Sequence, residues 1–222
     1  MFRDRRDAGM QLAERLRGYK DRDDVLILAL PRGGVVTGYE IARSLNAPLD
    51  VLIVRKIGFP GQPEFAIGAI SETGTIFLNE RIISTYGVSN EYVESEISRQ
   101  EKEISRRVKL YRQEKSIREL EGKIIILVDD GVATGATTKA AIETLKKEKI
   151  KELVVAIPVS PPQTADELKK MADEFVCIET PYDFMAVGAH YLDFTQVSDE
   201  EVIDLLKKSA ALEEKSQQRR ID

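Results

Sequence analysis

The chain has no tryptophan, one histidine, one cysteine and no long apolar run among its 222 residues. The single cysteine, Cys177, excludes an internal disulfide, and with only His190 beside it a zinc site rich in cysteine and histidine cannot form. We interpret Cys177 as a buried structural thiol in a strand, and His190 as a packing residue or a substrate contact. No run approaches the roughly 18 apolar residues of a membrane helix, so we expect no membrane association.

No charge of one sign predominates, since the net charge is −5 from 33 basic and 38 acidic residues. General nucleic-acid binding draws its affinity from clustered Lys and Arg, so we expect no nucleic-acid partner. Residues 1–18 are charged, show helical spacing and lack the apolar region of a secretory signal, which predicts a cytoplasmic protein.

Short apolar runs of strand length alternate with helical patterns from residue 25 onward. The runs are nearly continuous in Val, Ile and Leu, as in strands buried on both faces of a parallel sheet. This alternation predicts an α/β fold, a Rossmann-like parallel sheet flanked by helices, with ligands outside the carboxyl ends of the strands. The predicted strands are residues 25–30, 49–57, 123–130 and 153–159, and the helices lie within 35–45, 137–148 and 161–173.

Two loops each follow a predicted strand and open a predicted helix. In the first, "LPRGGVV", Gly33 and Gly34 let backbone N–H groups approach an anion, and Arg32 adds a positive charge. The second, "DDGVATGATT", begins with Asp129 and Asp130 and continues with small and hydroxylated residues at a helix N-terminus, which attracts phosphate. A phosphorylated sugar, with Mg²⁺ or hydroxyls at the carboxylates, would satisfy all of these groups.

Each loop by itself also has a purely structural interpretation. A Gly-Gly turn is often only a tight turn, and adjacent aspartates are often a helix cap or a solvated turn. The second loop lacks the spacing and the lysine of a Walker A motif, and the sequence has no G-x-G-x-x-G fingerprint. The functional prediction therefore depends on the two loops together.

At these residues the chain resembles the type I phosphoribosyltransferases. "IIILVDDGVATGATT" is similar to the family's phosphoribosyl pyrophosphate motif, and "LPRGG" to its pyrophosphate loop, in the same order along the chain. The resemblance covers about residues 25–158 and implies the family's fold in a single domain, residues 1–222. Within it we expect a core of about 25–180, a hood of about 1–20 and 181–208, and a disordered tail, 209–222.

The resemblance implies transfer of a 5-phosphoribosyl group from phosphoribosyl pyrophosphate (PRPP) to a nitrogenous, base-like acceptor, with release of pyrophosphate and Mg²⁺ as cofactor. Asp129 and Asp130 would act as catalytic residues that hold the ribose hydroxyls, directly or through Mg²⁺ and its waters. The other residues so assigned are Arg32, Gly33 and Gly34 for pyrophosphate, Arg55 and Lys56 for catalysis, and Ala133, Thr134, Gly135, Ala136, Thr137 and Thr138 for the 5′-phosphate.

One position departs from the family's 6-oxopurine branch, which has an aspartate where this chain has Ala133. This difference disfavours hypoxanthine and guanine as acceptors. In the family a hood recognises the acceptor, which implies that Phe184, Val187 and Tyr191 contact it here, although the aromatic rings of this segment could instead pack the hood onto the sheet. Ser198 begins a capping box that predicts a last helix at about 199–208, paired with the N-terminal helix.

Residues 58–74 stand where the family has a mobile loop that closes over the site. The alternative is a β-hairpin of residues 65–71 with 75–78, which leaves 58–65 as the lid. Glu64 and Glu72 are the candidates for a carboxylate that handles protons, and Glu64 is the one we assign as catalytic.

Residues 89–112 predict a long helix with an apolar stripe, packed on the body or on a second subunit. The alternative is binding of a polyanionic acceptor through Arg99, Lys102, Arg106 and Lys109. We expect a homo-oligomer, such as a dimer. For the function, the main alternative to a transferase is a sensor of PRPP or nucleotides on the same fold, since a hydrolase would need a nucleophile or metal cluster that the sequence does not show.

Overall fold

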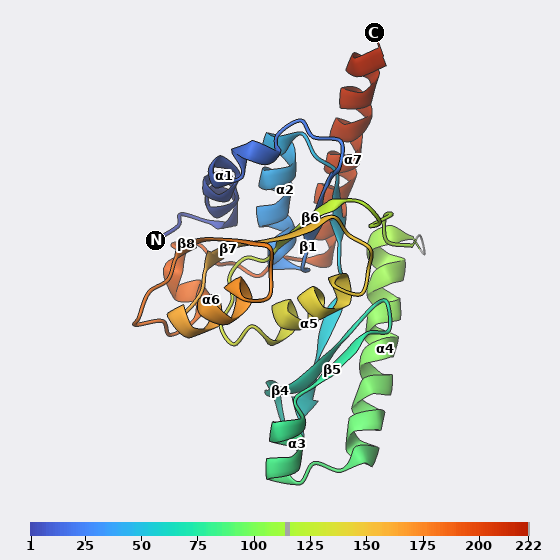
Figure 1. Ribbon diagram of the computed structural model, residues 1–222, viewed down its shortest axis with the longest axis vertical. Coiled ribbons are helices and arrows are strands. Elements are labelled where there is room, and N and C mark those ends of the chain that lie inside the picture. The colour runs from blue at the N-terminus through green and yellow to red at the C-terminus, as the bar shows by residue number, and fades with distance from the viewer. Residues whose placement is uncertain (114–115, 222) are drawn as a thin grey trace.

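Five parallel strands form the central sheet of the protein. The computed structural model describes residues 1–113 and 116–221. It describes only the backbone of Glu64, Gln217, Arg219, Arg220 and Ile221. The strands are β1 (Val25–Ala29), β2 (Leu49–Val51), β6 (Ile124–Val128), β7 (Glu152–Val159) and β8 (Glu174–Glu179) (Figure 1). Their order is β2-β1-β6-β7-β8, and every residue of β1 and β6 is buried. The predicted α/β fold with a parallel sheet is confirmed.

Helices cover both faces of this sheet (Figure 1). One face has α1 (Arg5–Arg15), α2 (Gly33–Leu45) and α7 (Asp199–Ile221), and the other has α5 (Ala136–Leu145) and α6 (Pro162–Lys169). Successive side chains of a strand point to opposite faces, so Ile27 lies in one core with Ile41 of α2 and Leu28 in the other with Leu145 of α5. In the described ranges, none of the helices is both long and apolar enough to cross a membrane.

The predicted strand at residues 49–57 is wrong in one respect, because it is two strands in two different sheets. After β2 ends at Val51, the chain continues as β3 (Val54–Phe59), which pairs with β4 (Gln62–Ser71) and then β5 (Ile76–Leu78) in a separate antiparallel sheet. Hydrogen bonding changes partner at the break: the Leu52 N–H donates to Ala29 of β1, whereas the Ile53 carbonyl accepts from Glu72, after β4. The residues on both sides of the break are buried, so the sequence stays apolar there and gives no sign of the change of sheet.

The predicted hairpin of β4 and β5 is confirmed, with Ile70 opposite Ile76. Residues 58–65 are not the free lid of the prediction, because Phe59 pairs with Gln62 and both belong to a second hairpin of β3 and β4. Its turn contains Gly61 at φ +74°, a conformation that favours glycine. Pro60 and Gly61 form this tight turn, while Gly58 lies in β3 and Pro63 in β4.

The antiparallel sheet, α3 (Glu80–Tyr86) and α4 (Asn90–Arg112) form a lobe that extends from the central sheet (Figure 1). α4 begins after Ser89, whose hydroxyl accepts the N–H of Tyr92 at 3.2 Å. Val93, Ile104 and Tyr111 are buried in a core shared with β3 and β4, while most charged residues of α4 are exposed or half-buried. The predicted long helix with one packed face is confirmed.

The N-terminal segment and the segment before α7 lie together as a hood over the carboxyl ends of the strands. Phe2 forms a β-bridge with Tyr191, and its N–H donates to the His190 carbonyl at 2.8 Å.

Two details of the prediction for the last helix are wrong. α7 continues past Lys208 to Ile221, through the expected disordered tail, which is rich in the helix formers Glu, Lys, Gln and Arg. α1 and α7 lie on either side of α2 (Figure 1) and meet at an ion pair of Arg6 with Glu201 at 3.7 Å, instead of packing along each other.

α1 approaches α2 closely at Gly9, where a Cβ atom would lie 2.6 Å from the backbone oxygen of Thr37. We expect G9A to lower the free energy of unfolding by about 1–3 kcal/mol, because overpacking against a backbone outweighs the better helix propensity of alanine. Urea denaturation measures this change. G18A is the matched control, since a Cβ there meets nothing within 4 Å. A G9A protein as stable as the control would show that α1 can shift without cost.

Candidate active site

The two predicted loops lie side by side at the carboxyl ends of β1 and β6. These strands are neighbours from which the chain turns in opposite directions, toward β2 and toward β7, so they form the switch point at which open α/β sheets bind ligands. The Leu30 N–H donates to the Val128 carbonyl at 2.9 Å. A Cβ atom on Gly34 would lie 2.9 Å from that same oxygen, so glycine is required for this close approach.

Gly33 brings the first loop into contact with the carboxylates of the second. A Cβ atom on Gly33 would lie 1.8 Å from Oδ2 of Asp130, so any other residue here would force the Asp130 carboxylate to move. α2 begins at Gly33, and the first N–H groups of a helix have no partner within the helix. The first loop therefore presents backbone donors directly beside the carboxylate pair.

The second loop presents the N-terminus of α5. Gly135 precedes this helix at φ +75°, the left-handed region that favours glycine. Thr134 is exposed and Thr137 half-buried, whereas only 1% of Thr138 is exposed. The hydroxyl of Thr164 donates to the Ala133 carbonyl at 2.7 Å and holds the loop in place. An anion here could bind to the backbone donors and to Thr134 and Thr137, while Thr138 is buried in the protein.

Asp129 and Asp130 have different surroundings at the end of β6. Burial, and then the neighbouring charge of Asp130, raises the pKa of Asp129 well above its usual range. Asp130 instead accepts a hydrogen bond from Nε of Arg5 at 2.6 Å. Arg5 also donates to the Thr195 carbonyl at 2.8 Å and lies over the ring of Phe194, 3.7 Å from its centroid. Sequence reasoning missed Arg5, because only the fold distinguishes it from the other arginines of the N-terminal helix.

Arg32, which we expected to bind pyrophosphate, faces a carboxylate of the protein itself. Its Nη1 atom lies 3.9 Å from Oδ1 of Asp199, the first residue of α7. Nη2 of Arg106 lies 3.7 Å from the other oxygen of this carboxylate, Oδ2. The hydroxyl of Tyr111 donates to Oδ1. Burial, together with that hydrogen bond, raises the pKa of Tyr111. The fold thus brings one cation of α4, Arg106, to the first loop.

The remaining catalytic candidates lie in the lobe. Arg55 and Lys56 are consecutive in β3, so their side chains point to opposite faces of its sheet. Nε of Arg55 donates to the side-chain oxygen of Gln100 on α4 at 3.0 Å. Glu72 forms a buried ion pair with an arginine of α4, so it is not the free acid or base that we considered. The side chain of Glu64 lies outside the described residues.

The three predicted acceptor residues lie in the hood, and two of them contact the residues that follow β6. The hydroxyl of Tyr191 donates to the Asp130 carbonyl at 2.5 Å, and a Cβ atom on Gly131 would lie 2.3 Å from Cγ1 of Val187. Tyr191 is 6% exposed and its ring contacts two phenylalanines of the hood, so it packs the hood onto the sheet. Phe184 stacks on the only histidine of the chain, with 5.3 Å between the ring centroids.

Cys177 lies in β8 and is half-buried. Burial raises the pKa of its thiol to about 11, so the thiol stays protonated at neutral pH. Its Sγ atom donates to the Glu179 carbonyl at 3.3 Å. These features agree with a structural thiol.

The residues at the end of β6 fit Mg²⁺ only as part of a complex with substrate. Across the described ranges, no group of three or more His, Cys, Asp or Glu side chains could hold a metal ion by itself. Mg²⁺ is commonly bound by one or two carboxylates together with substrate phosphates and water, and Asp129 and Asp130 could supply these carboxylates. Arg5 already binds Oδ2 of Asp130, so a metal ion would share or displace that bond.

Comparison with known proteins agrees with this geometry. Residues 3–193 match the family model of the phosphoribosyl transferase domain. The chain is 43% identical over 209 residues to Rv0571c of Mycobacterium tuberculosis, whose name assigns it provisionally to the phosphoribosyl transferases, with 94% of this chain and 47% of that protein aligned. The crystal structure of TT1426 from Thermus thermophilus is 43% identical with a TM-score of 0.79, and the match covers 93% of this chain and 98% of that one.

The chain therefore belongs to the phosphoribosyltransferase family, as the resemblance of its two loops predicted. It spans about half the length of the curated relatives that it matches. Family membership does not test the role of any single residue, so the assignments of Asp129, Asp130, Arg32 and the two loops stay predictions.

Proposed function

We propose that the protein transfers a 5-phosphoribosyl group from PRPP to a nitrogenous acceptor and releases pyrophosphate. The observation that supports this most directly is the contact between the two loops, where Gly33 lies against Asp130. PRPP has a phosphate at one end of a sugar and a pyrophosphate at the other, with two hydroxyls between them. A protein that binds PRPP therefore needs two anion-binding loops with polar groups between them. The two loops and the carboxylates of Asp129 and Asp130 have this arrangement.

In the proposed complex the 5′-phosphate binds to the loop before α5, and the pyrophosphate binds to Arg32 and the N-terminus of α2. The C1–oxygen bond to pyrophosphate breaks and its electron pair leaves with the pyrophosphate. The nitrogen of the acceptor forms the new bond to C1, and its proton passes to the departing pyrophosphate or to water. Asp129 and Asp130 hold the ribose hydroxyls and stabilise positive charge on the ring, while Arg32 stabilises negative charge on the leaving group. Mg²⁺, when bound, would supply further charge neutralisation at the pyrophosphate oxygens.

Two charged side chains of the protein, Arg5 and Asp199, occupy positions that Mg²⁺ and the pyrophosphate would take in the proposed complex. Arg5 neutralises Asp130 at 2.6 Å, and Asp199 lies within 4 Å of both Arg32 and Arg106. PRPP would have to replace Asp199 beside the two arginines, and Mg²⁺ would compete with Arg5. Arg106 of the long helix α4, which also donates two hydrogen bonds to Glu103 at 2.8 and 3.0 Å, would then be a second cation beside the pyrophosphate.

We expect D199N to bind PRPP about two- to fivefold more tightly, because the variant removes a negative charge worth about 0.5–1 kcal/mol of competition at a partly exposed site. Isothermal titration measures the change. D204N is the matched control, since Asp204 lies on the same helix in an exposed ion pair with Lys208. Weaker binding by D199N would mean that Asp199 positions Arg32 for the ligand instead of competing with it.

The proposed function is tested by titrating PRPP into the protein with and without Mg²⁺, followed by a screen for pyrophosphate release. The screen should include purine, pyrimidine and pyridine acceptors, with hypoxanthine and guanine as the members that Ala133 disfavours. Binding together with release for one class of acceptor would support the transferase. Binding without release from any acceptor would favour a sensor, and no binding would overturn both.

A further inference from the structure

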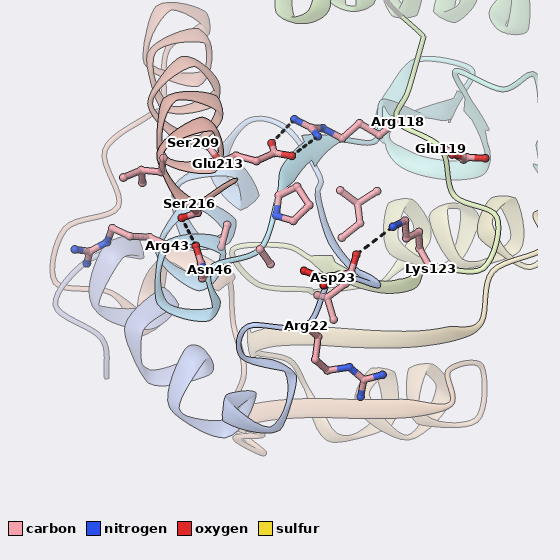
Figure 2. A pocket seen from close by; sticks show the side chains of 16 residues that line it. Arg22, Asp23, Arg43, Asn46, Arg118, Glu119, Lys123, Ser209, Glu213 and Ser216 are labelled. Carbon is pink, nitrogen blue, oxygen red and sulfur yellow. Dashed lines mark hydrogen bonds and ion pairs between the residues drawn. The ribbon is translucent and has the colours of Figure 1, made fainter. Parts of the chain in front are cut away.

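A cavity of about 590 Å³ lies at the amino ends of the strands, at the opposite end of the central sheet from the candidate active site (Figure 2). Its walls include Val25 and Leu26 of β1, the end of α2 and the C-terminal half of α7. The volume is within the roughly 300–1,000 Å³ of typical small-molecule sites. None of the residues that we assign to phosphoribosyl transfer lines this cavity.

Two cations lie along one side of the cavity, on the segment that leads into β6 (Figure 2). The guanidinium of Arg118 donates two hydrogen bonds to Glu213 of α7, at 3.0 and 2.8 Å. Lys123 is half-buried and donates to the backbone carbonyl of Asp23 at 3.1 Å. In the part of the chain that the structure describes, Lys123 has no ion pair with a carboxylate. A partly buried ammonium without a counter-charge favours an anion beside it.

The other charged residues of the wall limit what this anion can be. Arg43 and Arg22 are bound to neighbouring carboxylates, and their side chains point away from Lys123 (Figure 2). Asp23, Glu119 and Glu213 also line the cavity, so a chain of two or three phosphates would be repelled more strongly than one phosphate group, whose charge is about −1.5 to −2 at pH 7. The site therefore suits a ligand with a single anionic group.

The rest of the cavity wall favours a ligand whose remaining part is apolar, with polar groups along one edge. Leu26, Pro48 and Leu212 contribute apolar surface. Asn46 and Ser216 lie across the cavity from Lys123, joined by a hydrogen bond of 2.6 Å (Figure 2). Asn46 also donates to Asp21 at 3.0 Å, which leaves its second amide hydrogen and the acceptor oxygens of both residues for a polar edge.

We propose that this cavity is a second small-molecule site, for a ligand of mononucleotide size with one phosphate group and a compact apolar or planar body. The phosphate binds to Lys123 and competes with Glu213 for Arg118. The body lies on the apolar surface, with its polar edge toward Asn46 and Ser216. Because Glu213 and Ser216 both belong to α7, the ligand also contacts the C-terminal half of this helix.

Adenosine 5′-monophosphate is a suitable probe. Inorganic phosphate and adenosine, which represent its two parts, are tested separately. Calorimetry without PRPP should show saturable binding of the whole molecule that is weakened about tenfold or more in K123M, because a charge-assisted hydrogen bond to phosphate is lost. Hydrogen exchange should slow in residues 209–216 when the probe is bound to the wild-type protein. K149M is the matched control, since Lys149 is 83% exposed and lies outside the cavity.

The 5′-phosphate of the probe could also bind to the loop before α5 in the candidate active site, so T137E, which places a negative charge in that loop, separates the two sites. Binding that persists in T137E and is weakened in K123M supports the cavity. Binding that is lost in T137E and kept in K123M, or no saturable binding, overturns the proposal. If K123M fails to fold, the exchange measurement decides, because unprotected residues 209–216 at saturating probe would also overturn it. None of these outcomes depends on phosphoribosyl transfer.

Discussion

The variant D129N/D130N is expected to bind PRPP with Mg²⁺ at least about 100-fold more weakly than the wild-type protein. Hydrogen bonds to a charged group contribute about 1.5–3 kcal/mol each, so loss of the bond from one ribose hydroxyl to charged Asp130 would account for about 100-fold, and Asp129 would add to this when Mg²⁺ and substrate favour its charged form. Asparagine keeps the shape of the side chain, so the loss would come from charge. Isothermal titration measures the affinity, and pyrophosphate release for the best acceptor should fall at least as much.

Single variants separate the two carboxylates. D130N also removes the partner of Arg5, so part of its effect would come from a partly buried guanidinium left without its carboxylate. D129N has no such partner to lose, and since burial already disfavours the charge on Asp129, we expect the variant to keep the stability of the fold. An affinity that is unchanged in the double variant would place the sugar elsewhere and overturn the assignment of both residues.

The largest effect on stability is expected for R112M. Arg112 lies at the end of α4 with 7% of its side chain exposed, in an ion pair with Glu72 and 3.9 Å from Asp50. Burial lowers the pKa of Arg112. Methionine would leave two buried carboxylates without a cation, which is expected to lower the free energy of unfolding by about 3–5 kcal/mol.

The measurement is urea denaturation, with R17M as the matched control. Arg17 forms an ion pair with Glu14 in which both side chains are largely exposed, so its loss should change stability by less than about 1 kcal/mol. An R112M protein as stable as R17M would show that water reaches and solvates the carboxylates. The result also tests how the lobe is attached, because Asp50 lies in β2, Glu72 follows β4 and Arg112 ends α4.

The lobe also shows where sequence reasoning reached its limit. Residues 49–57 form one run that is apolar except for Asp50, Arg55 and Lys56, and a strand prediction depends on that pattern alone. Which neighbour accepts the hydrogen bonds of each residue is a property of the assembled sheets, so the change of sheet between Val51 and Val54 has no local signal. The hairpin of β4 and β5 could be predicted, because alternation and a Gly-containing turn are local features.

Local chemistry was enough to predict the sheet and to single out two loops that the structure places side by side, although the roles of their residues stay predictions. The apolar strands, the glycines of both loops and the adjacent Asp129 and Asp130 predicted the parallel sheet and the place where its ligand would bind, because strand burial and helix N-termini depend on neighbours in sequence. The tertiary structure alone decided which distant charges meet there. Arg5 reaches Asp130 across 125 positions, and Asp199 reaches Arg32 only after α7 has packed beside α2. Such pairs depend on how the whole chain packs, which no short stretch of sequence specifies.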